Sequence, residues 1–330
     1  MCWLRRAHFL VVFAFILALA PRGFGQATSG SILGRIADST DAVVVDAEVV
    51  ARNENTGLTQ RSKTDNDGYV VRNLPPGTYT ITVSKSGFKT VTQSEVLLVV
   101  DQKLRLDFVL APGSTSETVT VTGEPPLLQT QTVETGDVIQ SRQILDLPLN
   151  GRNFLQLARL TPGVIGGAGG NTSNLAVNGQ REFANSIMID GVETTSNRNN
   201  DNSLSPSVDA VEQFKVVTSA YSAEYGHAAG AVVSIQTKSG SNGYHGSAYE
   251  FFRPNNTAAQ PYSFGLSEPP GALKHHNFGA TIGGPIKKDK LFFFGSYEGF
   301  RLRDRFSELL DVPPAGQINY LPNGDVDLSG

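Results

Sequence analysis

The sequence predicts a mostly β protein, and three observations carry this prediction. Short runs of β-branched and aromatic residues alternate with polar residues, as in Thr78–Val83, where every second side chain is apolar. Turn-forming residues separate these runs at short intervals, as in Asp65–Gly68 and Pro75–Gly77. Near the end of the chain, alternating runs have aromatic residues at their ends, which is typical of strands that cross a membrane.

The length and charge of the chain limit its class. Its 330 residues suggest two or three domains. Lysine and arginine number 27 and aspartate and glutamate 31, which gives a net charge of −4 and argues against a nucleic-acid partner. Cys2 is the single cysteine, so no disulfide framework is expected.

Residues 1–26 are predicted to be a secretory signal peptide. Arg5 and Arg6 precede the apolar run Phe9–Ala20, which is shorter than the about 20 residues of a bilayer-crossing helix. Small residues follow and suit cleavage before Gln26. An anchored N-terminus is the alternative interpretation.

Residues 29–112 are predicted to form a Greek-key β-sandwich. Several short strands separated by turns are typical of that architecture. The expected strands are Ile32–Ile36, Ala47–Ala51, Tyr69–Val71, Tyr79–Val83, Val96–Val100 and Leu104–Leu110.

The residue types do not predict an enzyme, a metal site or a cofactor site. None of the five histidines stands in an H-x-x-E or H-E-x-x-H frame, which zinc sites use. Asp65–Gly68 lacks the alternate oxygen ligands and the distant glutamate of a calcium loop, so it is interpreted as a turn. No catalytic residue is therefore assigned.

Residues 113–131 are predicted to be a linker, and one segment in it alternates polar and apolar residues. Two interpretations of this segment are open. It is either the last strand of the preceding sandwich or an extended, unpaired segment that adds to the sheet edge of a partner. Its position between two modules favours the second interpretation. Its residues are Glu117, Thr118, Val119, Thr120, Val121 and Thr122.

Residues 132–243 are predicted to form an α+β module. Asn153 is expected to cap a short helix that Pro162 and Gly163 end. The apolar face of this helix is expected to hold Phe154, Leu157, Ala158 and Leu160. Two strands are expected at Leu175–Arg181 and Ile187–Val192, and their polar ends offer residues for buried ion pairs, although solvated loop charges are the plainer interpretation. These residues are Arg181, Glu182, Asp190 and Glu193.

The same module is expected to end in a compact β-rich unit. Val208, Val211 and Phe214 recur every three residues, as on a short helix or turn, before β-rich runs at Lys215–Val217 and Ala231–Thr237. Small residues just before the second run allow another backbone to approach closely.

Residues 244–330 are predicted to begin a transmembrane β-barrel. Strands are expected at Gly246–Arg253, Asn277–Gly283 and Leu291–Phe300. In the second of these, Phe278, Ala280 and Ile282 share one face. About three strands are expected, and their open edges would not be viable in a bilayer, so they are expected to be only the beginning of a barrel.

Several segments resemble one protein family, the TonB-dependent outer-membrane receptors of the Oar-like group, which carry an N-terminal carboxypeptidase-regulatory-like domain. The segments are TDNDGY (64–69), LPPGTY (74–79), LPLNGRNFLQLARLTPGV (147–164), FKV (214–216), AEYG (223–226), TKSG (237–240) and NFGATIGGPIKKDKLFFFGSYEGFR (277–301). The resemblance implies that residues 132–243 are a plug, that 117–122 are similar to a TonB box, and that the chain is the N-terminal part of a receptor. The plug residues it suggests are Arg152, Arg181, Asp190, Glu193 and Glu224.

The resemblance also implies a place and partners. The chain is expected in the outer membrane, with the sandwich and plug on the periplasmic side. Its partners are then a TonB-type energy-coupling protein, membrane lipids and an extracellular ligand, which is an oligosaccharide, a peptide or a siderophore. The alternative is a secreted or periplasmic β-sandwich protein, without enzyme activity, that binds carbohydrate or protein.

Residues 29–112 should fold by themselves as a soluble domain, because they contain their own alternating core and turns. A thermal melt of this fragment should be cooperative and should not change when a chelator is added. A flat melt, or one that the chelator abolishes, would contradict the prediction.

Overall fold

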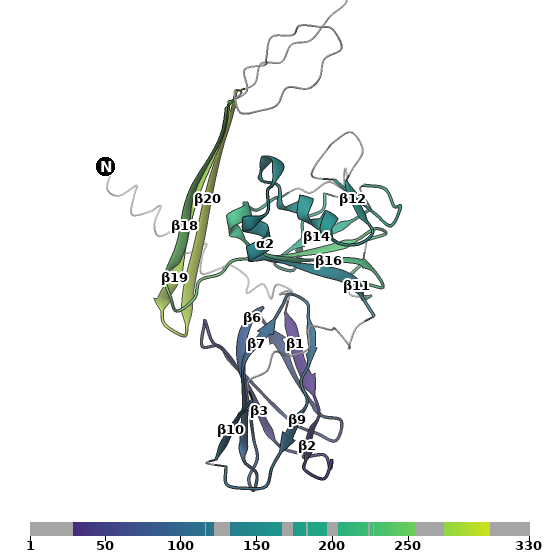
Figure 1. Ribbon diagram of the computed structural model, residues 1–330, viewed down its shortest axis with the longest axis vertical. Helices are drawn as coiled ribbons and strands as arrows, with labels where there is room; N and C mark the ends of the chain where they lie inside the picture. The colour runs from purple at the N-terminus through teal and green to yellow at the C-terminus, as the bar shows by residue number, and fades with distance from the viewer. Residues whose placement is uncertain are drawn as a thin grey trace, which may run out of the picture. The chain divides into compact units, whose positions relative to one another are not determined.

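The computed structural model describes residues 29–115, 117–121, 133–166, 174–182, 184–196, 204–223, 225–226, 228–254 and 274–303. Its parts are mostly β, as the sequence predicts, and Figure 1 labels the strands and helices. The predicted signal peptide, Thr122 and Glu224 lie outside the described residues.

The first module is a β-sandwich, as predicted. One sheet has the strand order β10-β7-β6-β3-β4, and the others have the orders β5-β1-β8 and β2-β9. The strands are β1 (Gly30–Gly34), β2 (Ile36–Asp38), β3 (Glu48–Asn53), β4 (Thr59–Lys63), β5 (Tyr69–Leu74), β6 (Gly77–Ser84), β7 (Thr90–Leu98), β8 (Lys103–Arg105), β9 (Phe108–Leu110) and β10 (Thr118–Val121).

The core of the sandwich forms on the face that the alternation predicts. Tyr79, Ile81 and Val83 of β6 are all fully buried. The Tyr79 hydroxyl donates to the Pro75 carbonyl oxygen at 2.7 Å, and the Tyr69 hydroxyl donates to the Leu106 carbonyl oxygen at 2.8 Å. Burial raises the pKa of both phenols, because the ionised form would lose its hydration.

Two predicted strands are each divided in the structure. The run Ile32–Ile36 becomes β1 and β2, and the run Leu104–Leu110 becomes β8 and β9. At the break the Asp107 carboxylate accepts a hydrogen bond from the Arg35 backbone N–H at 2.7 Å, so a side chain replaces a backbone acceptor. β1 then pairs with β8, and β2 pairs with β9, both in parallel.

Two edge strands of the large sheet correct the sequence prediction. β4 was not predicted, because its sequence TQRSK is polar on both faces. Thr118–Val121 is extended as predicted, but the expectation that it is unpaired is wrong. It forms β10, parallel to β7, with Val119 opposite Val91 and Thr120 opposite Thr92.

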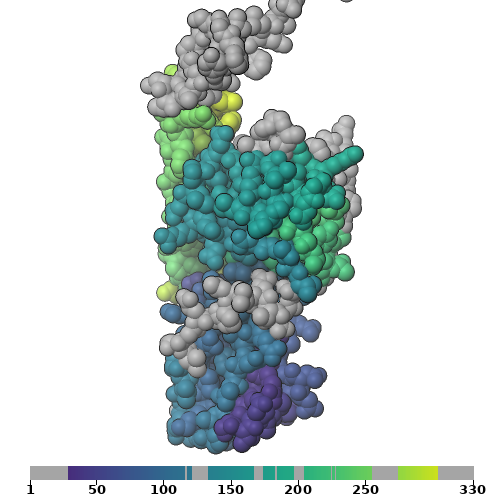
Figure 2. Space-filling view, turned by 45° about the vertical axis from the view of Figure 1, so that its right-hand side comes forward, coloured from purple at the N-terminus to yellow at the C-terminus, as the bar shows by residue number. Residues whose placement is uncertain are grey.

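The second module, 133–237, contains a five-stranded sheet of order β11-β16-β17-β14-β15. Short helices lie over one face of this sheet (Figure 1), and the module forms one teal-to-green body in Figure 2. Its elements are β11 (Thr135–Gln140), α2 (Ser141–Asp146), η1 (Asn150–Arg152), η2 (Phe154–Leu160), β12 (Val164–Gly166), β13 (Leu175–Val177), β14 (Ser186–Ile189), β15 (Val192–Glu193), η4 (Val208–Ala210), β16 (Val211–Ser219) and β17 (Val232–Thr237).

The predicted short helix of this module exists, with one correction. Asn153 caps it, because its side chain accepts from the Leu155 backbone N–H at 3.0 Å. The helix is a 3-10 helix, and Leu160 is 54% exposed, so its predicted place on the buried face is wrong. Leu155 is buried instead, and Thr161, just after the helix, turns inward with 2% exposure.

The last part of the described chain is a three-stranded sheet of order β18-β19-β20. Its strands are β18 (His245–Pro254), β19 (Lys274–Lys287) and β20 (Leu291–Arg303). The predicted alternation in β19 is confirmed, because Asn277 and Thr281 are buried while Ile282 is 58% exposed. In the described residues, no helix has the length and apolar character needed to cross a membrane.

The Thr64 hydroxyl, just after β4, should be essential for holding the segment Val44–Ala47 that leads into β3. It donates to the Val44 carbonyl oxygen at 2.7 Å and accepts from the Ala47 N–H at 2.8 Å, and Thr64 is buried. Thr64→Val keeps the shape but leaves both backbone groups unpaired, which should cost about 2 kcal/mol of unfolding free energy. Calorimetry of the sandwich transition measures this, and Thr59→Val, at an exposed site, is the control.

If Thr64→Val and Thr59→Val shift the transition equally, the buried hydroxyl does not have this role.

Candidate functional site

The first candidate site is β10 (Thr118–Val121) together with Glu117, the residue that precedes it. The Thr90 backbone N–H donates to the Glu117 carbonyl oxygen at 2.9 Å, and the parallel ladder with β7 follows. The Lys89 ammonium lies 2.6 Å from the Glu117 carboxylate, but these side chains are 35% and 57% exposed. Because such a surface ion pair contributes little, the ladder is the main attachment of β10.

The side chains of this segment add little to the core. Glu117, Thr118 and Thr120 are exposed, and Val119 is 44% exposed. β10 is also the end strand of its sheet. An exposed end strand offers its free backbone groups to another β-strand.

The second candidate site is a buried ion pair between Arg152 and Asp209. The Arg152 guanidinium contacts the Asp209 carboxylate, and the two side chains are only 12% and 10% exposed. The turn that carries Arg152 is tight, because Gly151 and Arg152 both have positive φ, 69° and 53°. The Gln156 side-chain amide closes this turn by donating to the Asn150 carbonyl oxygen at 2.6 Å.

A short chain of hydrogen bonds continues from this ion pair to the first strands after the module. The Ser247 hydroxyl of β18 lies 3.4 Å from the second Asp209 carboxylate oxygen. Ser247 in turn contacts the Thr281 hydroxyl of β19 at 2.9 Å. The turn that carries Arg152 is therefore linked to the beginning of the last sheet by polar side chains.

A second buried ion pair fixes the edge of the five-stranded sheet. The Lys215 ammonium of β16 lies 2.7 Å from the Glu134 carboxylate, and their side chains are 4% and 11% exposed. Glu134 immediately precedes β11, which pairs antiparallel with β16. The pair therefore ties the point where the chain enters this module.

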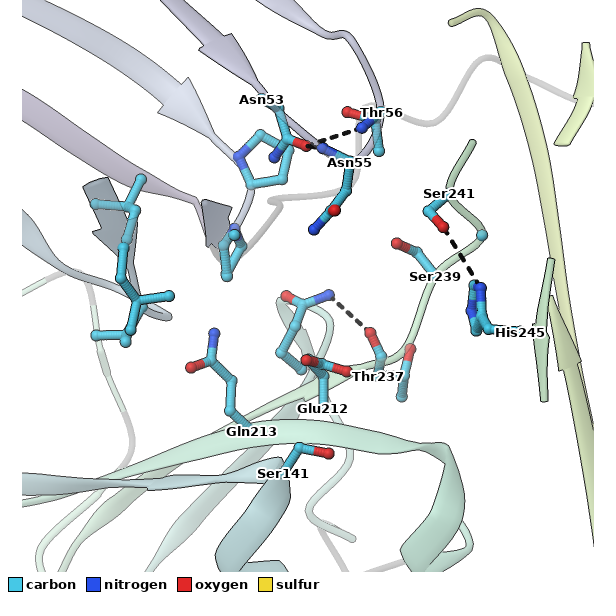
Figure 3. A pocket seen from close by; sticks show the side chains of 18 of the residues that line it. Asn53, Asn55, Thr56, Ser141, Glu212, Gln213, Thr237, Ser239, Ser241 and His245 are labelled. Carbon is cyan, nitrogen blue, oxygen red and sulfur yellow. Dashed lines mark hydrogen bonds between the residues drawn. The ribbon is translucent and has the colours of Figure 1, made fainter. Parts of the chain in front are cut away.

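Two polar residues, the partly buried Asp190 and the buried Asn185, hold the parallel strands β14 and β17. The Asp190 carboxylate accepts from the backbone N–H and the hydroxyl of Thr237, at 2.9 and 2.6 Å; Thr237 ends β17 and is labelled in Figure 3. The Asn185 amide donates to the Leu175 carbonyl oxygen at 2.6 Å and accepts from the Ala231 N–H at 2.8 Å. The Gly230 backbone N–H donates to the Ala184 carbonyl oxygen at 2.8 Å, so the close approach of another backbone expected before Ala231 is present.

The structure brings together only some of the residues that the sequence suggested. Arg152 forms the ion pair with Asp209, and Asp190 is bonded to Thr237. Arg181 and Glu193 are exposed, which agrees with the interpretation as solvated loop charges and not with the alternative of buried ion pairs. The Ser186 hydroxyl lies 3.4 Å from the Glu193 carboxylate. Glu224 lies outside the described residues.

Sequence reasoning missed the partners Asp209, Glu134 and Asn185. Among these, only the Glu134 contact has a signal in the sequence, which is its partner Lys215. A lysine inside the apolar run of a strand must either face water or bind a buried partner. Across the residues that the structure describes, no group of three or more potential metal-ligating side chains gathers.

Lys215→Met should destabilise the edge of this module, because it leaves the Glu134 carboxylate buried without its cation. Breaking a buried pair on one side costs about 3–5 kcal/mol. Hydrogen exchange of the β11 and β16 amides in the whole chain should therefore become faster by more than about a hundredfold.

The double variant Lys215→Met/Glu134→Leu should exchange more slowly than Lys215→Met, because no buried charge remains. The exposed Lys103 supplies the control, Lys103→Met. If Lys215→Met exchanges like the control, the ion pair is not important for this edge.

Three protein-family descriptions match successive parts of the chain. Residues 31–111 match the carboxypeptidase regulatory-like domain, residues 129–233 match the TonB-dependent receptor plug domain, and residues 236–328 match an outer membrane beta barrel domain.

A curated relative matches most of the chain. The TonB-dependent transporter Oar of Myxococcus xanthus is 29% identical over 304 residues, which cover 87% of this chain and 28% of the relative. This chain thus spans less than a third of the length of that relative.

Two solved structures are also similar. The siderophore receptor PirA of Acinetobacter baumannii is 24% identical with a TM-score of 0.39, over 51% of this chain and 25% of that chain. PirA of Pseudomonas aeruginosa is 20% identical with a TM-score of 0.32, over 46% and 26%.

The three family matches occur in one chain, in the same order as the modules described above, and the Oar alignment runs across them. In this combination the chain is similar to the TonB-dependent transporter Oar, and it contains in order a match to the regulatory-like domain, a match to the TonB-dependent receptor plug domain and a match to an outer membrane beta barrel domain.

Proposed function

We propose that this chain is part of a receptor that imports an extracellular ligand through the outer membrane, with energy from a TonB-type protein. The observation that carries the proposal is the order of three features. An exposed end strand, β10, comes first, the plug with its buried ion pairs follows, and the plug leads directly into the amphipathic strands β18–β20.

Each feature has a role in this proposal. The plug closes the barrel, and Arg152–Asp209 and Lys215–Glu134 keep it in one arrangement at rest. The outward apolar residues of β18–β20 face membrane lipids. Residues 1–26 direct export, and the sandwich and plug lie on the periplasmic side. The ligand is an oligosaccharide, a peptide or a siderophore, and no catalytic role is assigned.

The alternative, a secreted or periplasmic binding protein, is less well supported. Large apolar side chains on the last sheet are more than half exposed, which a module surrounded by water avoids. They include Ile282, Tyr297 and Phe300.

The coupling role of β10 is the part of this proposal that is simplest to test. We propose that Glu117–Thr122 is the segment that the TonB-type protein binds. Deleting these six residues from the chain should abolish its capture by the purified periplasmic domain of a TonB-type protein in a pull-down. Thr120→Ser should bind like the unchanged chain, because main-chain pairing tolerates a side-chain change.

Calorimetry of the same deletion variant checks that the sandwich still unfolds cooperatively. If the deletion variant is folded and is captured as well as the unchanged chain, the coupling role of this segment is wrong.

A further inference from the structure

We propose that the TonB-type protein pairs with the outer edge of β10 while β10 remains on the sandwich, so that the sandwich is part of the docking platform. This inference rests on the proposed function and names how its partner binds. The partner strand would be the sixth strand of the sheet β10-β7-β6-β3-β4.

The direction of the backbone groups in β10 supports this inference. The Glu117 carbonyl oxygen accepts from the Thr90 N–H, so the backbone of residue 117 is directed toward β7. Successive peptide groups of a strand alternate between its two sides. The groups of Val119 and Val121 are thus directed toward β7, whereas those of Thr118 and Thr120 are directed away from it. These outward groups can pair with a second strand without any release from β7.

The composition of β10 separates it from the other end strands of the two larger sheets of the sandwich, β4, β5 and β8. Natural edge strands are protected from pairing by charged residues, particularly lysine, or by proline. β4 carries exposed Arg61 and Lys63, β5 carries exposed Arg72, and β8 carries exposed Lys103 and Arg105. β10 has the sequence TVTV, with neither charge nor proline. Of these four edges, β10 alone has no such protection.

The partner that fits this edge is an extended strand that binds mainly through its backbone. The side chains of β10 that the structure describes are exposed and small, so they offer little to select a side chain of the partner. We assign the edge to the TonB-type protein, because β10 is followed in the chain by a TonB-dependent receptor plug domain. Pairing between two copies of the chain is the competing outcome of the test.

A disulfide lock distinguishes binding in place from binding after release. Thr92 and Thr120 are directly opposite each other in the ladder, so Thr92→Cys/Thr120→Cys should cross-link β10 to β7. Cys2→Ser removes the one native cysteine. The purified periplasmic domain of a TonB-type protein should bind the oxidised and reduced chains with affinities equal within about threefold.

A proline at Thr120 tests the outward edge. Its N–H is directed away from β7, and an edge strand tolerates proline where the N–H faces solvent. Thr120→Pro should therefore leave the sandwich melt unchanged and weaken partner binding by at least about tenfold. Thr59→Pro, at the start of the opposite edge strand β4, is the matched control and should bind normally.

Each outcome decides one question. If the oxidised chain loses binding that reduction restores, β10 must be released and this inference is wrong, while the coupling role stands. Undiminished binding by Thr120→Pro also overturns the edge assignment. If analytical ultracentrifugation shows a dimer that Thr120→Pro dissociates while partner binding persists, the edge belongs to a second copy. Unchanged binding after deletion of 117–122 instead contradicts the proposed function itself.

Discussion

Backbone hydrogen bonding at the sheet edges is the constraint on which this structure depends. A strand inside a sheet satisfies its N–H and C=O groups on both sides, whereas an end strand does so on one side only. β10 and β11 are both end strands, and each has a single neighbour, β7 and β16 respectively. The segment between β10 and β11 therefore joins two strands that are each attached through one ladder.

Much of the fold can be predicted because its signals are local. The alternation in β6 identifies Tyr79, Ile81 and Val83 as core residues, and all three are buried. The cap at Asn153 and the small residues before β17 are also visible in a few residues of sequence. In β19 the alternation separates buried Asn277 from exposed Ile282. Each of these features needs only neighbouring residues.

The features that sequence reasoning missed depend on partners far away in the chain. Thr118–Val121 has the same alternation whether it is free or paired, and its partner β7 ends 20 residues earlier, at Leu98. Arg152 stands out beside its turn, but Asp209 is 57 residues away. Lys215 and Glu134 are 81 residues apart. The sequence does not predict β4 for another reason: an edge strand that is polar on both faces has no hydrophobic period.

β10, before residues 122–132, is attached to the sandwich less strongly than β11, after them, is attached to the plug. This difference predicts which of the two strands separates first in the proposed coupling. β10 is held by one short ladder and a surface ion pair, and its described side chains are exposed. β11 is held by a longer ladder, by the buried side chain of Ile139 and by the buried Lys215–Glu134 pair next to its start. A partner that has docked on β10 and then pulls would separate β10 from β7 before it disturbs β11. Under the proposed function, the sandwich would hold the coupling strand at rest, and force would reach the plug only after that strand has left the sandwich.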